Sequence, residues 1–104
     1  MSANQEILTS IKKSVQSVEP SSEIILFGSR ARGDAREDSD WDILILIPQS
    51  VDLKEEQKFR HKLFELELKF GQAISTLVKS KKEWENKYRV TPLYKNILRE
   101  GIKL

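Results

Sequence analysis

The chain has 104 residues, of which 33% are charged and 38% hydrophobic, and its formal net charge is +2 at pH 7. This length and balance are typical of one globular domain, so we expect a single domain over residues 1–104. The chain has no cysteine and one histidine, which excludes disulfides, thiolate metal sites and multi-histidine metal sites. This net charge is too weak to argue by itself for a nucleic-acid partner, and none is expected.

No targeting or membrane segment is expected. Residues 1–6 lack the basic and apolar regions of a signal peptide. The longest apolar run, residues 43–48, is far too short to cross a bilayer. We therefore expect a cytoplasmic protein with no membrane association.

The N-terminal part of the chain predicts a helix, a strand and a glycine turn. Apolar residues recur at helical spacing from about residue 4 to residue 18, and Pro20 follows them. Residues 23–27 predict a strand covered on both faces, because no polar residue stands in its middle. Ser29 is then the expected N-cap of one helical turn that closes at Gly33.

Residues 40–47 predict the central strand, and two aspartates stand at its start. Asp40 and Asp42 are two positions apart, so both carboxylates point to the same face of the strand. Adjacent carboxylates repel each other and are stabilised by a shared cation, which with oxygen ligands alone should be Mg²⁺ or Mn²⁺. The alternative interpretation is that both aspartates cap the preceding loop in solvent. Trp41 is expected in the core, on the opposite face.

The second half of the chain predicts helices around a third strand. Residues 52–70 form a long amphipathic helix before Gly71, and residues 73–78 form the strand. Ser80 and Glu83 have the spacing of a capping box for a short helix. Thr91-Pro92 begins a last helix that ends at Gly101, and its apolar side chains, Tyr94, Ile97 and Leu98, are expected to pack down. The order α-β-β-α-β-α-α predicts an α/β (α+β) fold with a small mixed sheet flanked by helices.

The glycine turn has the properties of a phosphate site. Gly28 has no Cβ, so a phosphate can approach the backbone closely, and Ser29 adds a hydroxyl at the start of a helical turn. Arg30 and Arg32 could contact phosphates or pair with nearby acids to fix the loop. Both interpretations stay open, with Arg30 the better candidate for the ligand.

The run Gly28-Ser29-x-x-x-Gly33-x5-Ser39-Asp40-x-Asp42 resembles the signature of the polymerase-beta-like nucleotidyltransferase superfamily. At this length the chain looks like a minimal nucleotidyltransferase (MNT), the antitoxin-type partner of HEPN proteins. The resemblance implies a polymerase-beta-like palm. It implies that Asp40 and Asp42 are catalytic and bind Mg²⁺, and that the nucleotide and its phosphates are bound by Gly28, Ser29, Arg30 and Ser39.

The sequence departs from this family at one position. Active relatives carry a third carboxylate on the strand after the long helix, where it helps to bind a second metal ion and to deprotonate the acceptor. Residues 73–78 contain no acid, and we place Ser75 at the vacant position. Glu65, Glu67 or Asp38 could substitute, but their spacing selects none of them.

Two functions follow from this resemblance. The first is a nucleotidyltransferase that moves NMP, with AMP the first choice, from a Mg-NTP to an acceptor hydroxyl. Because residues 1–104 are used up by the palm, the acceptor is expected on another chain, with a HEPN toxin the expected partner and this chain the antitoxin. The alternative is a catalytically degenerate nucleotide-binding module that binds and silences a partner without transfer.

Overall fold

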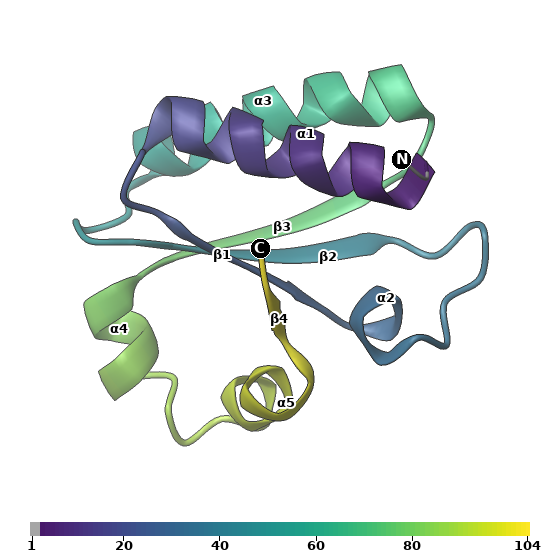
Figure 1. Ribbon diagram of the computed structural model, residues 1–104. Helices are drawn as coiled ribbons and strands as arrows, with labels where there is room; N and C mark the ends of the chain where they lie inside the picture. Colours follow the sequence, from purple (N-terminus) through teal and green to yellow (C-terminus); the bar gives the residue numbers. More distant parts are fainter. Residues whose placement is uncertain (1–2) are drawn as a thin grey trace.

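A four-stranded mixed sheet lies between two layers of helices in the computed structural model, which describes residues 3–104 (Figure 1). The strand order is β3-β2-β1-β4; β2 is parallel to β3, while β1 is antiparallel to both β2 and β4. The elements follow in the order α1 (Ala3–Val18), β1 (Glu23–Phe27), α2 (Ser29–Arg32), β2 (Trp41–Ile47), α3 (Leu53–Phe70), β3 (Ile74–Ser80), α4 (Lys81–Asn86), α5 (Pro92–Glu100) and β4 (Ile102–Lys103). The predicted mixed sheet flanked by helices is confirmed.

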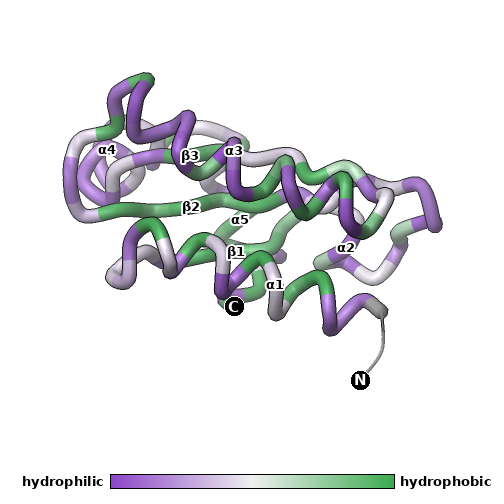
Figure 2. The backbone as a smooth tube through the Cα atoms, turned by 90° about the horizontal axis from the view of Figure 1, so that it is seen from above, coloured by the Kyte–Doolittle hydropathy of each residue, from purple (hydrophilic) through white to green (hydrophobic). Residues whose placement is uncertain are grey.

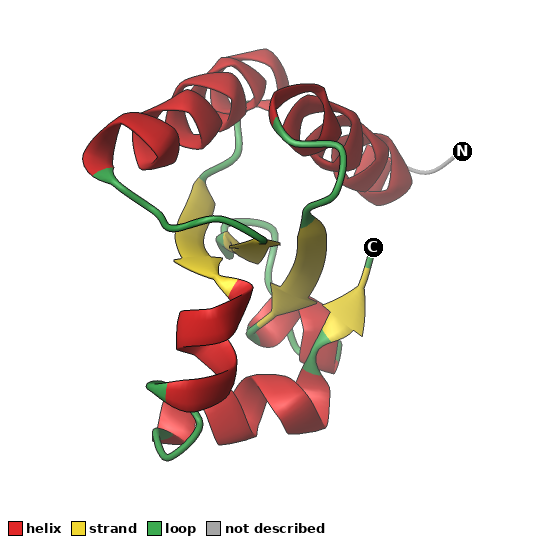
Figure 3. Cartoon of the chain, turned by 90° about the vertical axis from the view of Figure 1, so that its left-hand side faces the viewer, coloured by secondary structure: helices red, strands yellow, loops and turns green. Residues whose placement is uncertain are grey.

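Each face of the sheet has its own hydrophobic core, because side chains alternate between the faces along a strand. Helices α1 and α3 cover one face, and α4 and α5 cover the other (Figure 3). Strand β2 supplies both cores: Ile43 and Ile45 pack with the first pair of helices, and Leu44 and Leu46 pack with Trp84 and Ile97. In Figure 2 this strand is hydrophobic over most of its length, as expected for the buried centre of a sheet.

The predicted helix ends are largely confirmed by their caps. Ser80 accepts a hydrogen bond from the N–H of Glu83, and Thr91 accepts one from the N–H of Tyr94. Both bonds satisfy donors that the first helical turn leaves without partners. Trp41 is 2% exposed on the face of α1 and α3, as predicted.

Four details of the sequence prediction were wrong or incomplete. Strand β3 continues to Ser80, because it stays parallel to β2 as far as Ile47. Strand β4 was not predicted, since two residues carry no periodicity. Leu98 is 76% exposed and does not pack down. Ser29 is not an N-cap: Gly28 holds that position, and no side chain caps the turn.

Among residues 3–104, no helix is both long and apolar enough to cross a bilayer. The expectation that residues 1–6 form no signal peptide concerns residues 1–2 as well, and these two lie outside the described residues.

Candidate active site

The two predicted aspartates stand where β2 begins, beside the glycine turn that ends β1. Strand pairing places Asp42 opposite Phe27, the residue before Gly28. Asp42 alternates with Ile43 and therefore lies on the sheet face of α4 and α5. Asp40 directly precedes the strand and is exposed, whereas Asp42 is half-buried. The structure thus brings together the glycine turn and the acidic pair, as the sequence predicted.

Gly28 is required by the close approach of Asp42 from the neighbouring strand. Its φ of 75° lies in the region that favours glycine, and a Cβ at this position would overlap the Oδ2 of Asp42 and lie 3.0 Å from its Cγ. From the sequence alone, this glycine was expected to allow the close approach of a phosphate. In the structure, the group directly beside its Cα is the carboxylate of Asp42.

Asp42 lies in an environment that disfavours its charge. Its pKa is raised above the ordinary value, first by burial and then by the nearby charge of Asp40, with a further contribution from Glu100; Arg32 acts in the opposite direction. A half-buried carboxylate beside two other acids gains from a cation that neutralises them. This electrostatic arrangement fits a site for a positively charged ligand.

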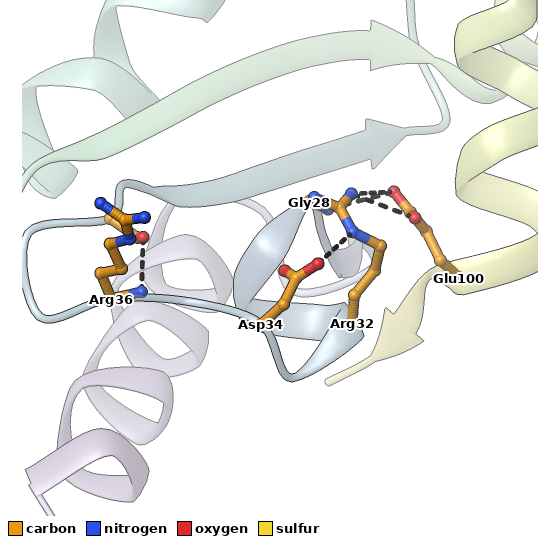
Figure 4. A network of polar contacts seen from close by, with 6 residues as sticks. Gly28, Arg32, Asp34, Arg36 and Glu100 are labelled. Carbon is orange, nitrogen blue, oxygen red and sulfur yellow. Dashed lines mark hydrogen bonds and ion pairs between the residues drawn. The ribbon is translucent and has the colours of Figure 1, made fainter.

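Arg32 and Glu100 also lie at the glycine turn, and Glu100 was not predicted to belong to the site. Arg32 Nη1 donates to both carboxylate oxygens of Glu100, at 3.3 and 3.2 Å, and the Gly28 N–H donates to Glu100 Oε1 at 3.3 Å (Figure 4). Arg32 Nε also pairs with Asp34 at 3.3 Å. Sequence reasoning missed Glu100, because it is 72 residues from Gly28 and no spacing connects them.

Arg30 takes the structural role that the sequence analysis left open. Its guanidinium lies over the ring of Trp41, 4.4 Å from the centroid, and donates to the carbonyl of Ser39 and to Gln72 Oε1. Trp41 donates to the same Gln72 oxygen. Arg30 thus holds the loop that leads into Asp40.

Ser39 also has its observed contacts inside that loop. Its hydroxyl accepts a hydrogen bond from the N–H of Arg36 at 2.8 Å, and its own N–H donates to the carbonyl of Arg36. Its carbonyl accepts a hydrogen bond from Arg30, so the hydroxyl, N–H and carbonyl of Ser39 all fix the backbone just before Asp40. Nucleotide binding by Arg30 and Ser39 remains a prediction.

The β3 side of Asp42 presents Ser75. Parallel pairing puts Ser75 in register with Asp42, and its side chain is exposed on the same face. Two of the substitutes considered from the sequence do not fit: Glu67 accepts a hydrogen bond from the N–H of Ile74, and Glu65 lies near His61 on the outer surface of α3. Helix α3 covers the opposite sheet face, so neither acid shares a face with Asp42.

The donor set fits a hard divalent cation. Asp40 and Asp42 offer oxygen ligands, and because burial and the nearby charge of Asp40 raise the pKa of Asp42, a cation would stabilise the charged form of its carboxylate. Within residues 3–104, no group of three or more histidine, cysteine or acidic side chains is arranged to hold a metal ion. A cation at Asp40 and Asp42 would therefore need further ligands from a nucleotide and water, as Mg²⁺ does at phosphate sites.

The fold, the glycine turn and the acidic pair define a class of protein. Residues 8–104 match the model of the nucleotidyltransferase domain, and the chain belongs to this family of transferases. It is 38% identical to a protein named protein adenylyltransferase MJ0141 of Methanocaldococcus jannaschii over 78 residues, covering 73% of this chain and 79% of that protein.

Two solved structures share the fold. One is named as a minimal nucleotidyltransferase, with a TM-score of 0.63 and 24% identity over 96% of this chain and 94% of that chain. The other is a toxin–antitoxin structure with AMP-PNP, with a TM-score of 0.67 and 20% identity over 91% of this chain and 69% of that chain. At these identities they support the fold alone.

Proposed function

We propose that this chain transfers AMP from Mg-ATP to a hydroxyl group of a partner protein. The observation that carries the proposal is the contact between the glycine turn and the acidic pair, with Asp42 directly against Gly28 and Asp40 beside it. The relative named protein adenylyltransferase supports the choice of AMP and of a protein acceptor. The one-domain organisation over residues 1–104 is part of this proposal.

Each part of the site has a role in this reaction. Gly28 and Ser29 would bind the β- and γ-phosphates through backbone N–H groups and a hydroxyl, and Asp40 and Asp42 would hold Mg²⁺. Mg²⁺ bound there supplies charge neutralisation and Lewis-acid activation of the phosphoryl group. Arg30 and Ser39 would act indirectly, by fixing the loop that carries Asp40. Together, the glycine turn and the two aspartates would hold the triphosphate in one orientation, which would lower the entropic part of the activation barrier for transfer.

The transfer itself exchanges one bond to phosphorus for another. The acceptor oxygen forms a bond to the α-phosphorus, the bond between the α-phosphorus and the bridging oxygen breaks, and pyrophosphate leaves. The hydroxyl proton passes to water or to a carboxylate near the acceptor. Active relatives are expected to use a third carboxylate for that step, and here Ser75 stands in register with Asp42 instead.

The proposed partner is a HEPN-type toxin, with this chain as its antitoxin. The sequence resemblance to minimal nucleotidyltransferases motivates this choice, and a structure that shares the fold belongs to a toxin–antitoxin system with AMP-PNP. A transferred nucleotide on an exposed tyrosine or other hydroxyl of the toxin would silence it.

A second function is favoured by one specific observation, the exposed Ser75 beside Asp42. Without an acid on β3, the chain could bind nucleotide and partner without transferring anything. The deciding experiment incubates the purified chain with α-labelled ATP, Mg²⁺ and the product of the neighbouring gene, and measures the intact mass of both proteins. A nucleotide added to the partner supports transfer. A stable complex without added mass supports the binding module, and labelling of RNA or a small molecule would remove the toxin assignment.

A further inference from the structure

The last residue of α5, Glu100, contacts the backbone N–H of Gly28, one of the groups proposed above to bind phosphate. Its side chain is only 15% exposed, although it ends a surface helix. Its two oxygens accept hydrogen bonds from the Arg32 guanidinium, and one of them also accepts a hydrogen bond from the Gly28 N–H (Figure 4). One carboxylate thus uses a backbone donor of the glycine turn and a charged donor from α2 together, which is the donor pattern that a phosphate oxygen would use.

The position of Glu100 distinguishes it from the missing third carboxylate. Sheet order places β1 on one side of Asp42 and β3 on the other. Glu100 contacts Gly28, at the end of β1, whereas the vacant position lies on β3 at Ser75. Glu100 therefore occupies the side of Asp42 that we assign to the triphosphate.

The electrostatics of this arrangement favour an exchange of anions. Glu100 contributes to the raised pKa of Asp42, so its negative charge is close enough to oppose that of Asp42. Arg32 and the Gly28 N–H compensate for this repulsion. A triphosphate entering with a cation brings both a stronger anion for these donors and a positive charge for the aspartates, so it can replace Glu100 at a modest cost.

The chain around Glu100 holds the carboxylate in place. The N–H of Gly101 donates to the carbonyl of Ile97 at 2.7 Å, which closes α5. The next two residues pair with β1, Ile102 with Leu26 and Lys103 with Ile25. The end of α5 is thus fixed to the strand that carries the glycine turn, and only the Glu100 side chain needs to move to uncover the donors.

We propose that Glu100 is an internal occupant of the phosphate site, which a triphosphate must displace to bind. This inference rests on the proposed function, since it takes the glycine turn to be the place where phosphates bind. It adds that the resting protein closes its own site and that nucleotide affinity is reduced by the fraction of molecules in which Glu100 is bound.

The test is the affinity of the full chain for inorganic tripolyphosphate and for ATP, each with Mg²⁺, in wild type, Glu100→Gln and Glu100→Asp. The first variant removes the charge, and the second keeps it on a side chain one methylene shorter. Both should bind about three- to tenfold more tightly than wild type, because the internal competitor is weakened. Glu65→Gln is the matched control: it makes the same change of charge on the exposed face of α3 and should leave the affinity unchanged.

A second measurement examines the contact without any nucleotide. The amide resonance of Gly28 in a ¹⁵N-correlated NMR spectrum should shift in both Glu100 variants and stay in place in the control. If wild type binds tripolyphosphate and ATP and the Glu100 variants bind them equally or more weakly, the inference is overturned, while the phosphate site is retained. Weaker binding by the variants would further indicate that Glu100 is itself a ligand. Absence of tripolyphosphate binding in every variant would overturn the phosphate site and this inference together.

Discussion

The polar groups near the Asp42 carboxylate differ between its two neighbouring strands, β1 and β3. On the β1 side stand the glycine turn, the Arg32 guanidinium and the Glu100 carboxylate, all joined by hydrogen bonds. On the β3 side stands an exposed serine in register with Asp42. The side assigned to the triphosphate is therefore preorganised, and the side where an acceptor would be deprotonated is not. This difference supports binding of a nucleotide more strongly than rapid transfer.

The largest expected effect comes from the residue that both sides share. Asp42→Asn should weaken Mg-ATP binding at least about 100-fold, because it removes one of the two proposed metal ligands. Isothermal titration at fixed Mg²⁺ measures the loss, with Glu37→Gln as the control for an exposed acid of the neighbouring loop. Equal affinities of wild type and Asp42→Asn would remove the metal assignment.

The same variant has a predictable effect on stability. Burial raises the pKa of folded Asp42 above its ordinary value, so the folded state holds the proton more tightly than the unfolded state. Stability associated with this group is then present at low pH and is lost as pH rises through the folded pKa. Asp42→Asn should melt close to wild type in acid and at a higher temperature near pH 7. Thermal melts across this pH range measure the difference; a variant less stable than wild type at pH 7 would contradict it.

The second prediction compares two glycines with the same kind of backbone. Gly28 and Gly33 both have positive φ, 75° and 85°, but a Cβ on Gly33 has no atom within 4 Å, whereas one on Gly28 overlaps Asp42. Gly33→Ala should cost about 1 kcal/mol of unfolding free energy from backbone strain alone. Gly28→Ala should cost at least about 2 kcal/mol and should also lose Mg-ATP binding, because Asp42 must move.

Urea unfolding and titration with Mg-ATP give both quantities for each variant. Equal costs in the two variants, with binding retained in both, would show that Gly28 serves only the turn.

The third prediction adds a carboxylate on the β3 side of Asp42. Ser75→Asp places an acid in register with Asp42, on an exposed position that can accept it without repacking. Mg²⁺ affinity, or the rate of AMP transfer, should rise about three- to tenfold, because a third carboxylate adds attraction for the cation. Ser75→Asn is the control for size without charge. A wild type that transfers rapidly and is slowed by Ser75→Asp would show that another group already does this work.

Much of this fold could be predicted from local patterns, and the parts that could not depend on contacts between distant segments. Residues 40–47 predicted the central strand with Trp41 in the core, and Thr91-Pro92 predicted the start of α5. Strand β4 exists only because β1 offers it an edge, and two residues carry no pattern of their own. Gly28, not Ser29, is the N-cap of α2, and its need to be glycine comes from Asp42 on another strand, which a Cβ would overlap.

The same limit applied to the site: residues close together in sequence could be predicted, and contacts with distant residues could not. The motif gave the acidic pair and the glycine turn, because these residues are close in sequence. It did not separate the two arginines, whose roles depend on what folds beside them: Trp41 and Gln72 beside Arg30, and Glu100 beside Arg32.

The smallest expected effect separates these two arginines. Arg30 stacks on Trp41 and binds the loop carbonyls, so its planar guanidinium contributes to stability; Arg32 is 46% exposed and faces the glycine turn. Arg30→Lys should lower the unfolding free energy by about 1 kcal/mol and change Mg-ATP affinity less than about twofold, because lysine keeps the charge and loses the stacked fork. Arg32→Lys should have the reverse pattern, with stability nearly unchanged and affinity lowered, since an ammonium cannot present two nitrogens to two phosphate oxygens at once. Urea unfolding and calorimetric titration of the two variants measure all four values. A larger loss of affinity in Arg30→Lys than in Arg32→Lys would place the phosphate contact at Arg30, as first expected from the sequence, and would assign Arg32 to the pairing of Asp34 and Glu100.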